Sequence, residues 1–102
     1  MGGVYNARRH KALTASGAVT TAGKAGILFS VNVYGDDDSA TASLVDNATG
    51  GTVKLIVVSP SGAIGSNSWT AVDGIVFDTD IFCNIAKVAT NALVTIEYEE
   101  VG

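Results

Sequence analysis

The chain has 102 residues, enough for one domain and too short for two, and its 47% apolar content excludes general disorder. A net charge of −4 at pH 7 leaves no broad basic surface for a phosphate backbone, so we expect no nucleic-acid partner. A single cysteine excludes an internal disulfide and fits a reducing compartment. Because no long apolar run is present, we expect no signal peptide and no membrane span.

The N-terminal residues 1–12 are predicted to form an extended arm that precedes a single domain over residues 13–102. The segment has no periodicity, and half of the six Lys and Arg residues lie between positions 8 and 11. It is interpreted either as a solvated tail or as an arm that orders on an acidic neighbouring surface, where arginines bind carboxylates. The candidate contact residues of the arm are Tyr5, Arg8, Arg9 and Lys11.

Alternation of apolar and polar side chains predicts the first strands of the domain. Ala12–Gly23 is weakly patterned and predicts an edge strand or an extended segment, whereas Gly26–Gly35 predicts a strong strand. The side chains expected to face the core are Ile27, Phe29, Val31 and Val33, and those on the opposite face are Leu28, Ser30, Asn32 and Tyr34. Asp36–Asp38 then predicts a turn, because three carboxylates are unfavourable inside a sheet.

Two further strands are predicted around a polar loop at residues 46–51. Ser39–Val45 alternates with Ala40, Ala42 and Leu44 inward. The next strand, Thr52–Val58, places Val53, Leu55 and Val57 on one face and Lys54, Ile56 and Val58 on the other. Because both faces are apolar near its end, this strand is expected either to be central in a sheet or to face a partner.

The second half of the chain predicts four more short strands. They are expected at Ser68–Val72, Gly74–Phe77, Ile81–Val88 and Ala92–Glu99, with a turn at Asp78–Asp80. In the last of them the inward face is Ala92, Val94, Ile96 and Tyr98, and the outward face is Leu93, Thr95, Glu97 and Glu99. A total of about seven or eight short strands with polar turns and no helix predicts an all-β, antiparallel β-sandwich, plausibly a jelly roll.

No arrangement of residues suits catalysis or a cofactor. The single histidine, His10, lies in the arm, where no rigid scaffold holds it for a Ser-His-Asp triad or a zinc site. Cys83 lies in a strand-like run and is expected to be a buried, inert thiol. Asp36–Asp38 with Asp46 or Asp73 offers oxygen ligands for calcium, but solvated turns are the favoured interpretation. We therefore expect neither an enzyme nor a cofactor or metal site.

The run G-I-V-F-D-T-D-I-F-C-N-I over residues 74–85 resembles a pattern in small virion proteins of tailed bacteriophages. In those proteins a glycine-hydrophobic element leads through a threonine-containing turn to an apolar strand, followed by a valine-rich last strand ending in tyrosine, as at Val94–Tyr98. Gly26–Tyr34 and Ala40–Asn47 are similar to upstream parts of the same pattern. The resemblance implies a head decoration (cement) protein, or a related head-fibre or tail accessory protein.

The resemblance also implies partners and a location. Such proteins are made in the host cytoplasm, bind the major capsid protein and often form homotrimers on the capsid surface of the virion. With the arm residues, the candidate interface side chains of the domain are Leu28, Tyr34, Ile56 and Val58, together with Leu93. Two other functions stay open. One is a carbohydrate-binding or adhesin-like module, with Trp69, Tyr34 and Tyr5 as its aromatic platform. The other is a small jelly-roll enzyme, which the shortage of histidine disfavours.

Overall fold

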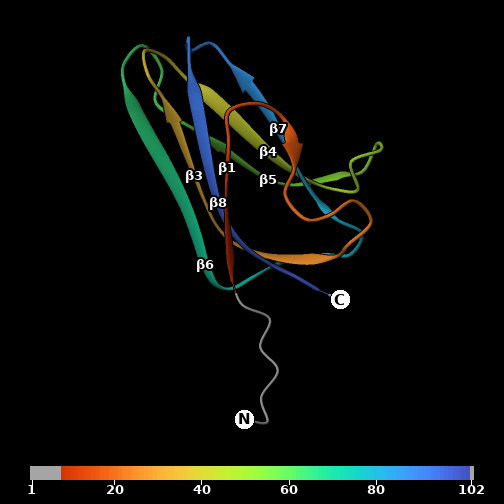
Figure 1. The fold of residues 1–102 in the computed structure, drawn as a ribbon. Coiled ribbons are helices and arrows are strands. Elements are labelled where there is room, and N and C mark those ends of the chain that lie inside the picture. The colour runs from red at the N-terminus through yellow and green to blue at the C-terminus, as the bar shows by residue number, and fades with distance from the viewer. Residues whose placement is uncertain (1–7, 102) are drawn as a thin grey trace.

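Eight antiparallel strands form two facing sheets in the computed structural model, which describes residues 8–101 (Figure 1). The strands are β1 (Arg9–Leu13), β2 (Gly17–Ala18), β3 (Gly26–Gly35), β4 (Ala40–Asp46), β5 (Thr52–Val58), β6 (Gly65–Phe77), β7 (Ile81–Lys87) and β8 (Ala92–Glu100). The expected all-β sandwich is confirmed. Among the described residues there is no helix long and apolar enough to cross a membrane.

The strand order is that of a jelly roll. The first sheet has the order β1-β8-β3-β6 and the second sheet has the order β2-β7-β4-β5. Each of the first four strands therefore pairs with one of the last four in reverse order: β1 with β8, β2 with β7, β3 with β6 and β4 with β5. This is a long hairpin rolled up so that β3 also pairs with β8 and β4 with β7.

The core lies between the sheets and is built from alternate residues of each strand. In β8 the predicted inward residues Ala92, Val94, Ile96 and Tyr98 are all buried, and in β4 so are Ala40, Ala42 and Leu44. Val31, Val33, Leu28, Phe77, Ile81 and Cys83 complete the centre of the core with no exposed side-chain surface. The period of two in the sequence thus translates directly into one buried face for each sheet.

A β-bulge in β3 corrects the predicted core face of this strand. Leu28 lies opposite Tyr98, but Ser30 lies opposite Glu97, so Phe29 is an extra residue in the ladder. An extra residue reverses the alternation. Leu28 is consequently fully buried in the core, where Ile27 and Phe29 were expected. The Phe29 ring is buried instead against Arg8, whose guanidinium carbon lies 3.8 Å from the ring centroid.

Two other predicted segments change at the edges of the first sheet. The strands expected at Ser68–Val72 and Gly74–Phe77 are one continuous strand, β6, which bulges at residues 71–74. At the opposite edge, β1 pairs with β8 from Arg9 to Leu13. The structure therefore assigns residues 9–12 to the sandwich rather than to the arm, while residues 1–7 lie outside the described part of the chain.

Gly74 should be intolerant of a side chain, because the β6 bulge sets it at φ 75° against β3. A Cβ there would lie 2.5 Å from the Ile27 Cγ2 atom and 2.8 Å from the Leu28 carbonyl oxygen. We expect Gly74→Ala to lower the free energy of unfolding by about 2–4 kcal/mol, measured by urea denaturation. Gly50→Ala is the matched control, since Gly50 has φ 76° with nothing within 4 Å. It should cost only about 1 kcal/mol. Equal losses in the two variants would contradict the close packing at the bulge.

Candidate functional site

The outer face of the second sheet carries no charged side chain. Its residues form three cross-strand rows over β5, β4 and β7, here called the uncharged face. The rows are Val58–Thr41–Ala86, Ile56–Ser43–Asn84 and Val53–Val45–Phe82. Directly opposite residues of an antiparallel pair point to the same side, so the rows make one continuous surface. Its exposed apolar content is concentrated along β5, because Val45 is buried and Phe82 is half-buried.

Strand β5 supplies the most exposed part of the uncharged face. Val53, Ile56 and Val58 are 48%, 58% and 45% exposed, while Leu55 and Val57 pack inward. A register shift between Leu44 and Val45 brings Val53 onto the same side as Ile56. The strand is thus apolar on both faces, as predicted. It is an edge strand rather than a central one. The exposure of Val53, Ile56 and Val58 shows that no strand or loop of the described chain covers its outer face.

The outer face of the first sheet, by contrast, has charged side chains such as Glu97 beside exposed Leu93 and Val76. It has a shallow hollow of about 150 Å³ lined by side chains and backbone of β1, β3, β6 and β8. The lining residues are His10, Ser30, Val31, Asn32, Ser68, Trp69, Thr70, Thr95, Ile96 and Glu97. Within it the Ser68 hydroxyl donates to Asn32 Oδ1 at 2.6 Å. The two outer faces of the sandwich therefore offer different chemistry to a partner.

The two arginines predicted for the arm make ion pairs within the chain. Arg8 Nη1 lies 3.5 Å from Glu97 Oε1, and Arg9 Nη1 lies 3.8 Å from Glu100 Oε2. The backbone N–H of Thr21, 2.7 Å from Glu100, is the main cause that lowers the pKa of that carboxyl group, and Arg9 adds a smaller part. Lys11 is half-buried opposite Ile96, and Tyr5 lies outside the described residues. The arginines thus fasten β1 to its own sheet.

The predicted apolar interface residues do not form one surface. Ile56 and Val58 lie together on the uncharged face. Tyr34 lies beside Leu93 on the outer face of the first sheet, on the opposite side of the sandwich. Leu28 is in the core with no exposed area, which corrects its placement on an outer face, because the bulge at Phe29 turns it inward.

Sequence reasoning missed three apolar members of the uncharged face: Val45, Val53 and Phe82. The outward position of Phe82 could have been predicted from the sequence. Ile81, Cys83 and Ile85 alternate inward, which leaves Phe82 on the outer face. The positions of Val45 and Val53 could not have been predicted, because the register shift that places them opposite one another depends on the pairing of β4 with β5.

The acidic turns hold neighbouring loops through backbone amides. Asp36 accepts from the Asn91 N–H at 3.0 Å, Asp37 from Thr90 at 2.8 Å and Asp38 from Gly62 at 2.9 Å. Each carboxylate of the Asp36–Asp38 turn is thus directed at a different amide. In the part of the chain that the structure describes, no three His, Cys, Asp or Glu side chains converge as metal ligands.

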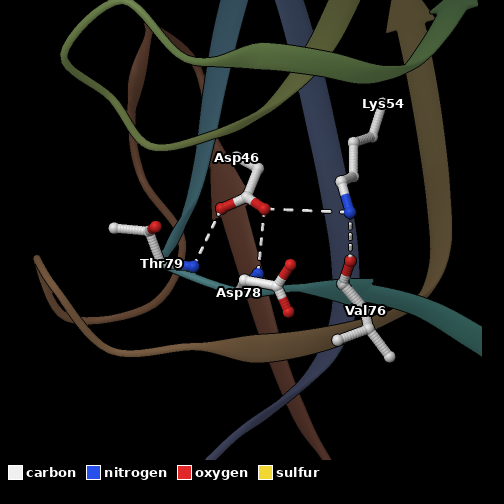
Figure 2. Close-up of polar contacts among 5 residues, drawn as sticks. All are labelled: Asp46, Lys54, Val76, Asp78 and Thr79. Atoms are coloured by element: carbon white, nitrogen blue, oxygen red, sulfur yellow. Dashed lines mark hydrogen bonds and ion pairs between the residues drawn. The ribbon is translucent and has the colours of Figure 1, made fainter.

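Asp46 makes the most developed of these contacts, at the end of β4 (Figure 2). Its two oxygens accept from the Asp78 and Thr79 N–H groups, each at 2.9 Å, and one lies 3.7 Å from Lys54 Nζ. Lys54 also donates to the Val76 carbonyl at 2.7 Å. Burial opposes ionisation of Asp46, but the Thr79 and Asp78 amides and the Lys54 charge outweigh it and lower its pKa. The cluster ties β4 and β5 to the turn between β6 and β7.

The two side chains considered for nucleophilic or acid-base chemistry do not form a site. Cys83 is fully buried, and burial raises the pKa of its thiol to about 11, so it stays protonated near neutral pH. His10 is exposed on β1, with its Nε2 atom 3.8 Å from Glu97.

Comparison with known proteins gives distant structural likeness alone. No protein-family model matches the chain, and a search of curated proteins found no match. Among solved structures, the chain is similar to one from the cryo-EM structure of the virus-like particle of extra small virus from the giant freshwater prawn Macrobrachium rosenbergii. The TM-score is 0.40 at 10% identity, and the alignment covers 98% of this chain and 82% of that chain. So distant a likeness leaves the function to be inferred from the surfaces of this chain.

Asp46→Asn should lower stability by roughly 1–3 kcal/mol at pH 7, because it removes the charge that the two amides and Lys54 stabilise. The native pKa lies below the ordinary value of 3.8, so this contribution is present above that value and is lost as the pH falls through the lowered native pKa. The difference between wild type and variant in urea denaturation should therefore shrink from pH 7 to pH 2–3. Exposed Asp73→Asn is the control and should change stability by less than about 0.5 kcal/mol. A gap that stays constant with pH would contradict this role.

Proposed function

We propose that this protein is a structural component of a virion that attaches to the major coat protein of a bacteriophage head through its uncharged face. The observation that carries the proposal is the absence of charge across three cross-strand rows that include exposed Val53, Ile56 and Val58. Exposed apolar side chains grouped along one strand, with no charge among them, are typical of protein–protein contact sites. The proposal assigns the chain no catalytic step.

The charge distribution supports a protein partner for this face. The chain has ten Asp and Glu residues, and none lies in the three rows. The centres of protein interfaces are depleted of charge, because burying an unpaired charge is costly. The small hydroxyl and amide side chains of Thr41, Ser43 and Asn84 can form hydrogen bonds with a partner without that cost.

The jelly-roll fold and the sequence of residues 74–85 support, by analogy, a role in a virion. The eight-stranded jelly roll is used by viral capsid domains, although lectins and cupins share it. The resemblance of residues 74–85 to small virion proteins of tailed bacteriophages favours the first of these uses. Quantitative mass spectrometry of purified particles tests this role: a decoration protein should be near-stoichiometric with the coat protein. Absence from particles would refute it.

Ile56→Asp should weaken attachment to particles that lack the protein by at least about ten-fold, because it places a charge in the centre of the uncharged face. Ile56 is 58% exposed, so the fold should be kept, as checked by circular dichroism. Val76→Asp is the matched control, since Val76 is 54% exposed on an edge strand of the other sheet. Equal occupancy of particles by wild type and Ile56→Asp would refute attachment through this face.

A second candidate function, glycan binding, is favoured by the polar hollow on the first sheet. Hydroxyl, amide and carboxylate groups converge there on a volume of about 150 Å³, a chemistry suited to a sugar. Of the expected aromatic platform, Trp69 lines the hollow but packs against the core, and Tyr34 is not among the lining residues. Tyr5 lies outside the described residues. If this function holds, a glycan array should give hits that Asn32→Ala abolishes and Ile56→Asp leaves unchanged. An array without hits would remove it.

A further inference from the structure

Strand β6 presents a long free edge. It is the last strand of the first sheet, with β3 on one side only, and its 13 residues make it longer than any other strand of the described chain (Figure 1). No charged residue and no proline lies between Gly65 and Val72. Such an edge exposes backbone N–H and C=O groups and is a ready template for another strand.

The other edges are protected by charge, by shortness or by a contact to the other sheet, whereas this part of β6 has no charged residue. At the opposite edge of the same sheet, β1 carries Arg9, His10 and Lys11. On β5, the Val58 carbonyl accepts from Asn67 Nδ2 at 3.1 Å, and β2 has only two residues. Charges, side-chain caps and shortness are the usual means of preventing strand addition. On β6 itself, Asn67 Oδ1 accepts from the Ser68 N–H at 3.0 Å, a local contact that pairing would displace, and Lys54 donates to the Val76 carbonyl beyond the bulge.

We propose that the β6 edges of two copies of this protein pair antiparallel about a two-fold axis. The pairing joins two four-stranded sheets into one of eight strands. The paired stretch is Ser66–Ala71, about 20 Å long at 3.4 Å per residue. It ends where β6 bulges away from β3 and Val72 is 87% exposed.

Three considerations favour a second copy as the occupant. Two chains with net charge −4 repel one another, and this stretch lets them meet without opposing like charges. A folded copy brings a strand that is already extended, so it avoids the ordering cost of a flexible peptide. Pairing of β6 with β1 of a further copy would leave a free edge at each end of the resulting chain of copies, and the Arg9 and Lys11 charges on β1 oppose it. The two-fold contact instead gives a closed dimer, because both β6 edges are used.

This contact is separate from the uncharged face, which belongs to the second sheet. It predicts a dimer or another even-numbered oligomer in place of the trimer that the bacteriophage resemblance implies. Its failure would leave attachment through Ile56 and its neighbours untouched.

Sedimentation velocity of the full chain over a concentration series tests the proposal. Wild type should form dimers, and Thr70→Lys should raise the dimer Kd at least about ten-fold by placing like charges near the two-fold axis. Thr95→Lys is the control, because Thr95 is an exposed threonine on the same sheet face but lies in the interior strand β8. It should leave the dimer Kd unchanged.

Hydrogen exchange of the wild type gives a readout that does not depend on any variant folding. Amides of Ser66–Ala71 should exchange more slowly as protein concentration rises, while those of β1 should not change. A wild type that stays monomeric up to about 1 mM, or one that forms only trimers, overturns the proposal. A dimer that survives Thr70→Lys but is lost in Ile56→Asp also overturns it, because it assigns the contact to the uncharged face.

Discussion

The antiparallel pairing of β3 with β8 is the interaction on which the rest of the sandwich depends. It brings Val31 and Val33 opposite Ile96 and Val94, and all four side chains are at most 1% exposed. The two strands are the interior strands of the first sheet, and β1 and β6 form their backbone ladders only with them. Because a shift of one residue would turn every side chain to the other face, burial of these valines fixes the register.

That register determines the chemistry of the two outer faces. On the first sheet it directs Ser30, Asn32, Thr95 and Glu97 outward, so this part of the face is polar. The corresponding pairing of β4 with β5 and β7 directs Ile56, Val58 and Phe82 outward on the second sheet. One side of the molecule is therefore well solvated and the other is depleted of charge. Under the proposed function, the charge-depleted side is the one that contacts the coat protein.

Regular alternation made most of the fold predictable from the sequence. In β8 and β4 one residue in two is apolar, and the inward faces were correctly predicted. The bulges were not predictable, because an extra residue such as Phe29 is recognised only against its partner strands. Strand β1 was also missed, since its basic residues have little strand preference, and pairing with β8 and ion pairs to Glu97 and Glu100 stabilise it.

Only some residues of the candidate site could be predicted from the sequence. The doubly apolar pattern of β5 pointed to Ile56 and Val58, but their neighbours Val45 and Val53 depend on a register shift. The acidic segments were recognised as turns, yet which amides they hold depends on how distant loops meet, as with Asp46 and the 78–79 backbone.

Footprinting of the protein on assembled particles tests the central claim most directly. Hydroxyl-radical labelling would compare side-chain reactivity on the particle with that of the free chain. The account predicts protection of Ile56, Val58 and Phe82 on the particle, with little change at Tyr34 and Leu93 on the other sheet. Protection of Tyr34 and Leu93 while Ile56 and Phe82 stay as reactive as in the free chain would contradict it.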